Sequence, residues 1–164
     1  MKRRILKMSL ASVAALLFAA QFVRPPRSNP PVVESHDIAS HVRVTPQVGA
    51  ILERSCNDCH SNRTEWPWYS HVAPASWFVV DHVNEGRRDM NFSEWPRRDT
   101  EALLKKICYE VKTGFMPLTS YTLLHRDARL SPADVQTLCD WAAAESERLK
   151  KIEVGGRGAE VSKN

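Results

Sequence analysis

The sequence predicts an all-α domain, preceded by an N-terminal targeting helix and followed by a short tail. Apolar residues between positions 43 and 152 recur at intervals of three and four, and no segment alternates convincingly as a strand would. Serine, threonine, proline and glycine stand where the predicted helices begin and end. With 164 residues, the chain has the length of one domain with extensions.

Residues 1–23 have the composition of an export signal. Four of the first seven residues are basic, and the run 8–23 that follows is uncharged and mostly apolar. No clean small-x-small cleavage site follows the run, which favours an uncleaved signal anchor over a cleaved signal peptide. The run is nevertheless short for a spanning helix, which needs about 20 apolar residues. The basic end is expected in the cytoplasm and the rest of the chain in the periplasm.

Residues 24–42 are predicted to form an extended, proline-rich linker. Four prolines fall within seven residues, together with serine and asparagine, and such a segment would hold the domain away from the membrane. The domain itself is expected over residues 43–152. The glycine-rich, polar segment 153–164 is expected to be a disordered tail.

The first two helices of the domain bracket its most unusual motif. Thr45 is a candidate N-cap with Pro46 in the first turn, and this helix would end at Cys56. A second helix is expected from about Pro74 to near Gly86.

The last two helices also carry cap signals. One starts at Asp99 or Thr100 and ends just before Gly114, a residue suited to the C-terminal cap. The other starts with Ser131 as N-cap and Pro132 in the first turn, and an aspartate three residues after the serine completes a capping box.

The segment Cys56-Asn57-Asp58-Cys59-His60 matches the C-x-x-C-H pattern of c-type haem attachment. Two thiols at this spacing can form thioethers with the two vinyl groups of one haem. The adjacent imidazole of His60 is then held beneath the iron as the proximal ligand. An export signal upstream agrees with this prediction, because c-type haem is attached after translocation.

Two other functions use paired cysteines, and both fit less well. A zinc site needs four ligands, usually from a second cysteine or histidine pair, whereas the other two cysteines are isolated. A thioredoxin-like dithiol starts a helix in an α/β pattern, whereas here the pair follows a helix in an all-α chain.

Met116 is the predicted sixth ligand of the iron. It stands in a Gly-Phe-Met-Pro sequence after the third helix, where the proline stiffens the loop that carries the thioether. Methionine is also a common core residue. The rivals are His71, His82 and His125, and a vacant sixth position is the remaining alternative.

Aromatic residues crowd the sequence behind the motif. Trp66, Trp68 and Tyr69 follow within ten residues of His60. Their ordinary role is core packing, and rings packed against a porphyrin would also exclude water from it. We therefore predict that these three side chains help to bind the haem.

Cys108 and Cys139 lie on the apolar stripes of the third and fourth helices. Each is either a small buried apolar residue or half of a disulfide. An oxidising compartment favours the disulfide, which would tie the helix before Met116 to the C-terminal helix.

The charge distribution argues against nucleic-acid binding. The whole chain has 23 basic and 19 acidic residues, a formal charge of +4, but six of the basic residues and no acids fall in residues 1–31. The remainder carries about −2, without the basic patch that a nucleic-acid-binding domain presents. A redox partner with a basic surface is the expected partner.

The chain resembles the haem-binding domain family of bacterial exported c-type cytochromes. The resemblance runs from Cys56 through the W-P-W-Y-S and G-R-R…N-F-S-E-W sequences to Met116-Pro117, and on through Leu124-His125 to the L-C-D-W sequence. It implies a small cytochrome c-like helical domain around one covalent haem c. It further implies His60 as proximal ligand and supports Met116 as distal ligand.

The predicted function is one-electron transfer by a monohaem c-type cytochrome. No catalytic acid-base pair is evident, so no catalytic residue is assigned. The alternative is a haem-based peroxidase-like enzyme or a gas or redox sensor, if Met116 is labile. Tyr121 or His125 near the iron would favour this alternative.

Overall fold

A computed structural model describes residues 2–96 and 99–161, and in this part of the chain the structure is helical without a strand. The α-helices are α1 (Lys2–Ala20), α2 (Pro46–Ser55), α3 (Asn57–His60), α4 (Ala75–Asp89), α5 (Thr100–Thr113), α6 (Thr119–Leu124) and α7 (Pro132–Val161). Short 3₁₀ turns lie between them at Glu34–His36, Ile38–Ser40, Trp68–His71, Phe92–Glu94 and Arg126–Ala128. The all-α prediction is confirmed for the described residues.

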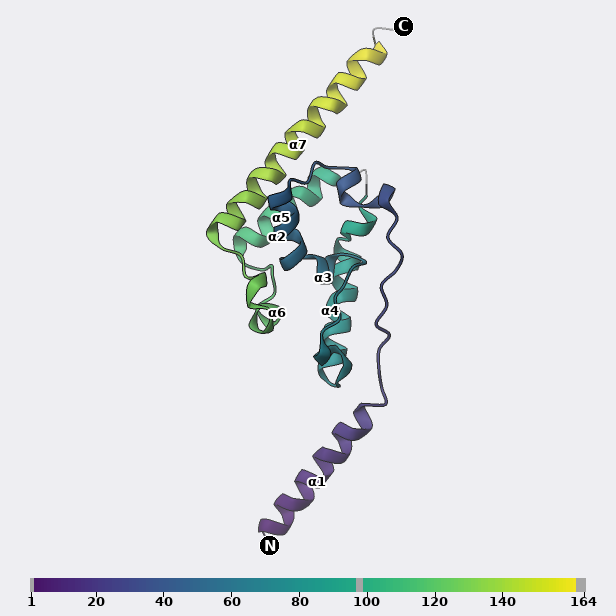
Figure 1. The fold of residues 1–164 in the computed structure, drawn as a ribbon, viewed down its shortest axis with the longest axis vertical. Coiled ribbons are helices and arrows are strands. Elements are labelled where there is room, and N and C mark those ends of the chain that lie inside the picture. The colour runs from purple at the N-terminus through teal and green to yellow at the C-terminus, as the bar shows by residue number, and fades with distance from the viewer. Residues whose placement is uncertain (1, 97–98, 162–164) are drawn as a thin grey trace.

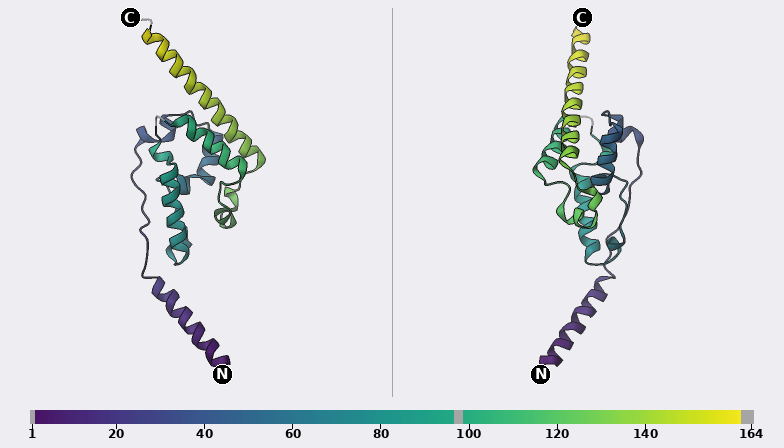
Figure 2. Two further views of the ribbon diagram at one scale, coloured as in Figure 1. Left: turned by 180° about the vertical axis from the view of Figure 1, so that it is seen from behind. Right: turned by 60° about the vertical axis from the view of Figure 1, so that its left-hand side comes forward.

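The elements form a small domain with a helix projecting at each end. Figure 1 shows α1 leaving one end and the C-terminal half of α7 leaving the other, with α2 to α6 between them. The views in Figure 2 show the same arrangement. The cysteine motif therefore lies in the middle of the molecule, on the one-turn helix α3.

The core lies between α2, α5 and α7. Helix α5 packs along α7, and α2 closes the layer. Ile51, Leu104 and Leu138 from these three helices are almost completely buried. Burial of apolar area of this kind is the main stabilising contribution to the fold.

The helix caps follow the sequence closely. The Thr45 hydroxyl accepts a hydrogen bond from the Val48 amide at 3.3 Å at the start of α2. The Ser131 hydroxyl accepts from the Asp134 amide at 3.1 Å, and the Asp134 carboxylate accepts from the Ser131 amide at 2.9 Å. This reciprocal pair is the predicted capping box. Gly114 ends α5 with a φ of 74°, a left-handed conformation that favours glycine.

The disulfide between Cys108 and Cys139 is present, with a Cα–Cα distance of 4.7 Å. It joins α5 to α7, as the sequence predicts. The bridge therefore holds α5, the helix that precedes the Met116 loop, against the longest helix of the domain.

The predicted linker 24–42 packs against the domain instead of holding it at a distance. Its second half enters the core, where Ile38 and Val42 are 6% and 2% exposed. Its first half, residues 24–33, runs as an extended segment along the domain, and we call it the strap. Figure 1 shows it running from the end of α1 past α4. The boundary predicted at residue 43 is therefore too late.

The strap is held by side chains from two motifs of the domain. The Arg87 guanidinium donates to the Ser28 carbonyl at 2.8 Å and to the Asn29 side-chain oxygen at 2.9 Å. Asn29 in turn donates to the Thr64 carbonyl at 2.9 Å and accepts from the Trp66 indole at 3.2 Å. Prolines leave strap carbonyls without local partners, and long-range donors satisfy them here.

Replacement of Asn29 by alanine is expected to destabilise the domain by about 1–2 kcal/mol, because its side chain makes three hydrogen bonds of roughly 1 kcal/mol net each at partly exposed positions. Urea unfolding measures this change. The control is Ser28→Ala, which removes a neighbouring side chain and leaves the Ser28 carbonyl in place. If both variants were as stable as the wild type, the hydrogen bonds of Asn29 would not contribute to holding the strap on the domain.

Helix α1 lies apart from the core, and none of its residues is buried. None of the described helices combines the length and the apolarity that a membrane crossing requires. At the other end, α7 continues as helix to Val161, through most of the segment predicted as a disordered tail. Residues 162–164 lie outside the described residues. The lysines and glutamates before Val154 are good helix formers, which allows the helix to run on beyond the core.

Candidate functional site

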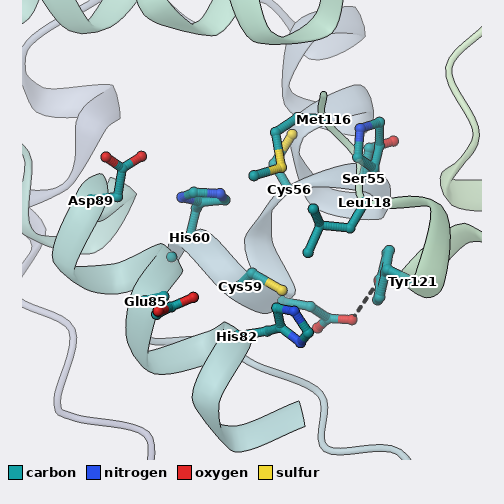
Figure 3. Close-up of a pocket in the computed structure, with 13 residues that line it drawn as sticks. Ser55, Cys56, Cys59, His60, His82, Glu85, Asp89, Met116, Leu118 and Tyr121 are labelled. Carbon is teal, nitrogen blue, oxygen red and sulfur yellow. Dashed lines mark hydrogen bonds between the residues drawn. The ribbon is translucent and has the colours of Figure 1, made fainter. Parts of the chain in front are cut away.

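The cysteine motif forms the end of α2 and all of α3. Cys56 caps α2, its amide donating to the Leu52 carbonyl at 2.9 Å, and the His60 amide donates to the Cys56 carbonyl at 2.9 Å. Residues three and four apart share one face of a helical turn. The thiols of Cys56 and Cys59 and the imidazole of His60 therefore point into the same space, as Figure 3 shows. Neither thiol is part of a disulfide.

His60 is oriented for a metal ion by the backbone of another segment. Its ring is buried, and Nδ1 lies 3.0 Å from the Met90 carbonyl oxygen. Because a carbonyl can only accept, Nδ1 carries the proton and Nε2 keeps a free lone pair. A hydrogen bond of this kind fixes the ring of a ligating histidine and makes its other nitrogen more basic.

Helix α4 packs unusually closely against α3. A Cβ atom at Gly86 would lie 2.5 Å from the Cys59 carbonyl oxygen. On the next residue, the Arg87 side chain donates to the Ser61 carbonyl at 2.8 Å. These contacts hold the motif against α4. The sequence predicted that α4 ends near Gly86, but the helix continues to Asp89, and Gly86 is instead the point of close contact with α3.

A cavity of about 350 Å³ opens in front of the motif, and we call it the main cavity because Cys56, Cys59 and His60 all line it. It is lined by α2 and α3 on one side, by α4 on the second and by the 116–121 segment on the third, as Figure 3 shows. Two smaller cavities share walls with it. One of about 230 Å³ shares Cys59, Leu118 and Tyr121, and one of about 80 Å³ shares Cys56, His60 and Met116. These three cavities adjoin one another through the residues that they share, and we call them together the motif crevice.

Met116 faces the motif crevice from the loop after α5. Its amide donates to the Glu110 carbonyl at 3.1 Å, which folds the loop back over the end of the helix. Met116 lines the main cavity and the small cavity beside it, in both cases together with His60. Figure 3 shows the two side chains facing the same space from different elements. The structure therefore brings Cys56, Cys59, His60 and Met116 together.

The three predicted aromatic residues occupy different positions. Tyr69 lines the 230 Å³ cavity, and its hydroxyl lies 2.7 Å from His125 Nε2. Trp66 does not line the motif crevice, and its indole donates to Asn29 of the strap. Trp68 is 78% exposed and lines none of the described cavities. Of the three aromatic residues in the W-P-W-Y-S sequence, one therefore contacts the strap, one lies on the surface and one lines the crevice.

Two polar side chains named in the sequence analysis, Tyr121 and His82, line the crevice wall, whereas the Asp58 carboxylate beside Tyr121 was not anticipated. The Tyr121 hydroxyl donates to the Asp58 carboxylate at 2.7 Å, and burial together with this carboxylate raises the pKa of Tyr121. His82 lies on the face of α4 that turns towards the crevice. Its position was predictable in principle, because Phe78, His82, Glu85 and Asp89 follow helical spacing. His125 stacks on Tyr121 with ring centroids 4.3 Å apart and lines a more polar neighbouring cavity, which shares Asp58 and Tyr121 with the main cavity but includes neither motif cysteine. His71 lies in the 3₁₀ turn Trp68–His71 and does not line the crevice.

Burial makes both motif thiols harder to ionise. It raises the pKa of Cys56 to about 12 and that of Cys59 to about 11, and the Asp58 carboxylate adds to the effect on Cys59. Thiolates are the species that oxidise to disulfides. The folded chain thus disfavours premature pairing of Cys56 with Cys59.

Protein produced without haem is expected to lose stability as the pH rises above about 8.5, where thiols of the unfolded chain begin to ionise. The raised pKa values mean that the folded state binds these protons more tightly, so stability is greatest below that pH and falls towards pH 11. Urea unfolding between pH 7 and 10.5 measures the slope. The double variant Cys56→Ser, Cys59→Ser serves as control and should fall less steeply. Identical slopes would contradict the account of the thiols.

These residues fit a haem. Two adjacent free thiols, an oriented imidazole with an open Nε2 and a thioether all border one crevice that is mainly apolar, as a porphyrin requires. The fold and the site define a helical haem-binding domain.

The chain belongs to the haem-binding domain family, whose profile matches residues 15–144. The match begins inside α1 and includes the strap, in agreement with the packing of that segment on the domain. No curated protein and no solved structure matches the chain.

Proposed function

We propose that the chain is a monohaem c-type cytochrome that transfers single electrons on the periplasmic side of the inner membrane. The observation that carries this proposal is the shared crevice of Cys56, Cys59, His60 and Met116. In this proposal the Cys56 and Cys59 thiols would hold the haem covalently, each by addition to one of its vinyl groups. His60 Nε2 and the Met116 sulfur would bind the iron.

The haem would supply the one-electron couple, and the chain would hold and tune it. The Met90 carbonyl keeps the proton of His60 on Nδ1, which favours metal binding through Nε2. The disulfide holds α5, which leads into the Met116 loop, against α7. Two side chains that stay bound to the iron would keep the structure similar in both redox states, which favours fast electron transfer.

The N-terminal helix is proposed to anchor the domain at the membrane. Its basic first turns favour the cytoplasm and its uncharged remainder favours lipid. In this arrangement the domain faces the periplasm, where c-type haem is attached and where the disulfide is stable.

The proposed partner is a redox protein with a basic docking surface. Three acids line the main cavity, namely Asp58, Glu85 and Asp89, of which Glu85 pairs with Arg88 and Asp89 with Lys106 outside it, and no lysine or arginine lines the cavity itself among the described residues. Complementary charge increases the rate of encounter between such partners. Haem propionates would add to the negative charge.

Addition of carbon monoxide to the reduced, haem-loaded protein tests the electron-transfer proposal. We expect the absorption spectrum to stay unchanged, because Met116 occupies the sixth position and carbon monoxide then has no open site. A complete shift of the spectrum would show an open or labile position and would contradict this proposal.

The second candidate is a peroxidase-like enzyme or a gas or redox sensor. Tyr121 and His82 favour it, because both place polar groups in the wall of the main cavity. A polar pocket beside the iron stabilises bound ligands. Under this alternative, carbon monoxide binds readily, and Tyr121→Phe weakens its binding.

A further inference from the structure

A group of exposed apolar side chains lies where α1 meets the domain. It consists of Phe22, Val23, Trp68, Val72 and Trp77, and we call it the apolar shelf. These side chains are between 39% and 78% exposed. The hydrogen bonds and cavities of the haem site involve none of the five. Isolated exposed apolar residues are ordinary, but five on segments that pack together at one end of a domain indicate a binding surface.

The apolar shelf is fixed to the end of α1. The Gln21 side chain donates to the Ala73 carbonyl at 3.0 Å and accepts from the Ala73 amide at 3.0 Å. The Trp77 indole donates to the Val23 carbonyl at 2.7 Å. The end of α1, the start of α4 and the loop before it therefore lie side by side, as Figures 1 and 2 show. The shelf continues the exposed apolar surface of α1, which includes Leu17 and Phe18.

The charges around the apolar shelf favour a lipid surface. The segments 17–28 and 66–78 contain no aspartate or glutamate, although the domain as a whole is acidic. Two arginines, Arg24 and Arg27, lie within the first of them. Tryptophan with neighbouring arginine is the composition of protein surfaces at the boundary between lipid and water, where arginine pairs with phosphate.

The length of the apolar run in α1 supports the same occupant. Its uncharged part, residues 8–20, is 13 residues long and spans about 20 Å as a helix, less than the roughly 30 Å of a hydrocarbon core. A short anchor draws flanking groups into the interface. The apolar shelf is the part of the domain that lies at the end of α1, so a short anchor would draw it into the headgroup region.

We infer that the apolar shelf inserts into the headgroup region of the periplasmic leaflet and holds the domain on the membrane in one orientation. This inference rests on the proposed N-terminal anchor. The strap and the Gln21 contacts would make the attachment rigid. The C-terminal end of α7, at the opposite end of the molecule, would then point away from the lipid (Figure 1).

Photo-crosslinking in the full chain tests the inference. Benzoylphenylalanine replaces Trp68 or Val72 in the haem-loaded protein, which is reconstituted in vesicles of phosphatidylethanolamine and phosphatidylglycerol and in native membranes. The control position is Tyr109 on α5, which is 60% exposed and does not belong to the shelf. We expect phospholipid adducts, identified by mass, at positions 68 and 72, and no such adducts at position 109.

A carbonate wash before illumination separates the two proposals. A protein that washes off the membrane overturns the anchor and the shelf together. A protein that stays in the membrane without lipid adducts at 68 and 72 keeps the anchor and overturns the shelf. Adducts to another protein at 68 and 72 would assign the shelf to a protein partner, and equal lipid adducts at all three positions would contradict a single orientation.

Discussion

Replacement of Met116 by alanine is expected to open the sixth coordination position while leaving the haem attached. Thioether ligation raises the potential of a haem, so its loss should lower the midpoint potential by on the order of 0.1 V, within the roughly 0.8 V range that axial ligands control. The far-red band from sulfur to oxidised iron should disappear, and carbon monoxide should now bind the reduced protein. Absorption spectroscopy and a redox titration measure these changes.

Leu118→Ala is the matched control for Met116→Ala. Leu118 comes from the same segment and lines the same main cavity, but it has no atom that binds iron. We expect this variant to keep the far-red band and to remain closed to carbon monoxide. A Met116→Ala protein with the spectrum of the wild type would show that another residue is the ligand, and His82 in the cavity wall would be the next candidate.

Replacement of Gly86 by alanine is expected to be the most damaging of the small substitutions in this chain. The new methyl group would lie 2.5 Å from the Cys59 carbonyl oxygen and 3.0 Å from the carbonyl carbon. Both are backbone atoms, so α3 must move away from α4. Overpacking of this kind costs about 1–3 kcal/mol, and displacement of α3 also moves Cys59 and His60. We expect lower stability in urea and a lower yield of haem-loaded protein.

Gly49→Ala provides the comparison for Gly86→Ala. Gly49 lies in the interior of α2, and an added Cβ would meet its nearest neighbour, Val44 Cγ1, at 3.6 Å, an ordinary contact. Alanine is the better helix former by about 1 kcal/mol, so this variant should be as stable as the wild type or more stable. Similar losses in both variants would mean that the close contact with Cys59 is not the cause.

Local sequence patterns predicted much of the domain. The starts of α2 and α7 follow from a capping residue before a proline, and the end of α5 follows from Gly114. The spacing of Cys56, Cys59 and His60 was sufficient to place three side chains on one turn, because that geometry depends on neighbouring residues alone. The disulfide was predictable because each cysteine lies on the apolar stripe of its helix.

Contacts between distant segments could not be predicted in the same way. Four prolines correctly indicated an extended strap, but composition does not show what an extended segment lies against. The Arg87 contacts with Ser28 and Asn29 join residues nearly sixty positions apart. For the same reason the sequence did not reveal that Trp66 turns to the strap, or that the Met90 carbonyl would orient His60.

Helix α6 and the wall that it contributes were missed for a different reason. Its six residues, Thr119–Leu124, are too few for a periodic pattern to stand out. Tyr121 therefore gave no signal of its position beside Asp58. This residue matters most for the choice between electron transfer and ligand binding, because Tyr121 is the polar side chain that the 116–121 segment contributes to the wall of the main cavity.

The mass of the denatured protein after coexpression with a cytochrome c maturation system tests the central claim most directly. Covalent attachment at Cys56 and Cys59 predicts a chain heavier by one haem, which stays bound in denaturant, and no such addition in the Cys56→Ser, Cys59→Ser variant. A wild-type chain that matures without any bound haem, or that releases its haem on denaturation, would contradict the account.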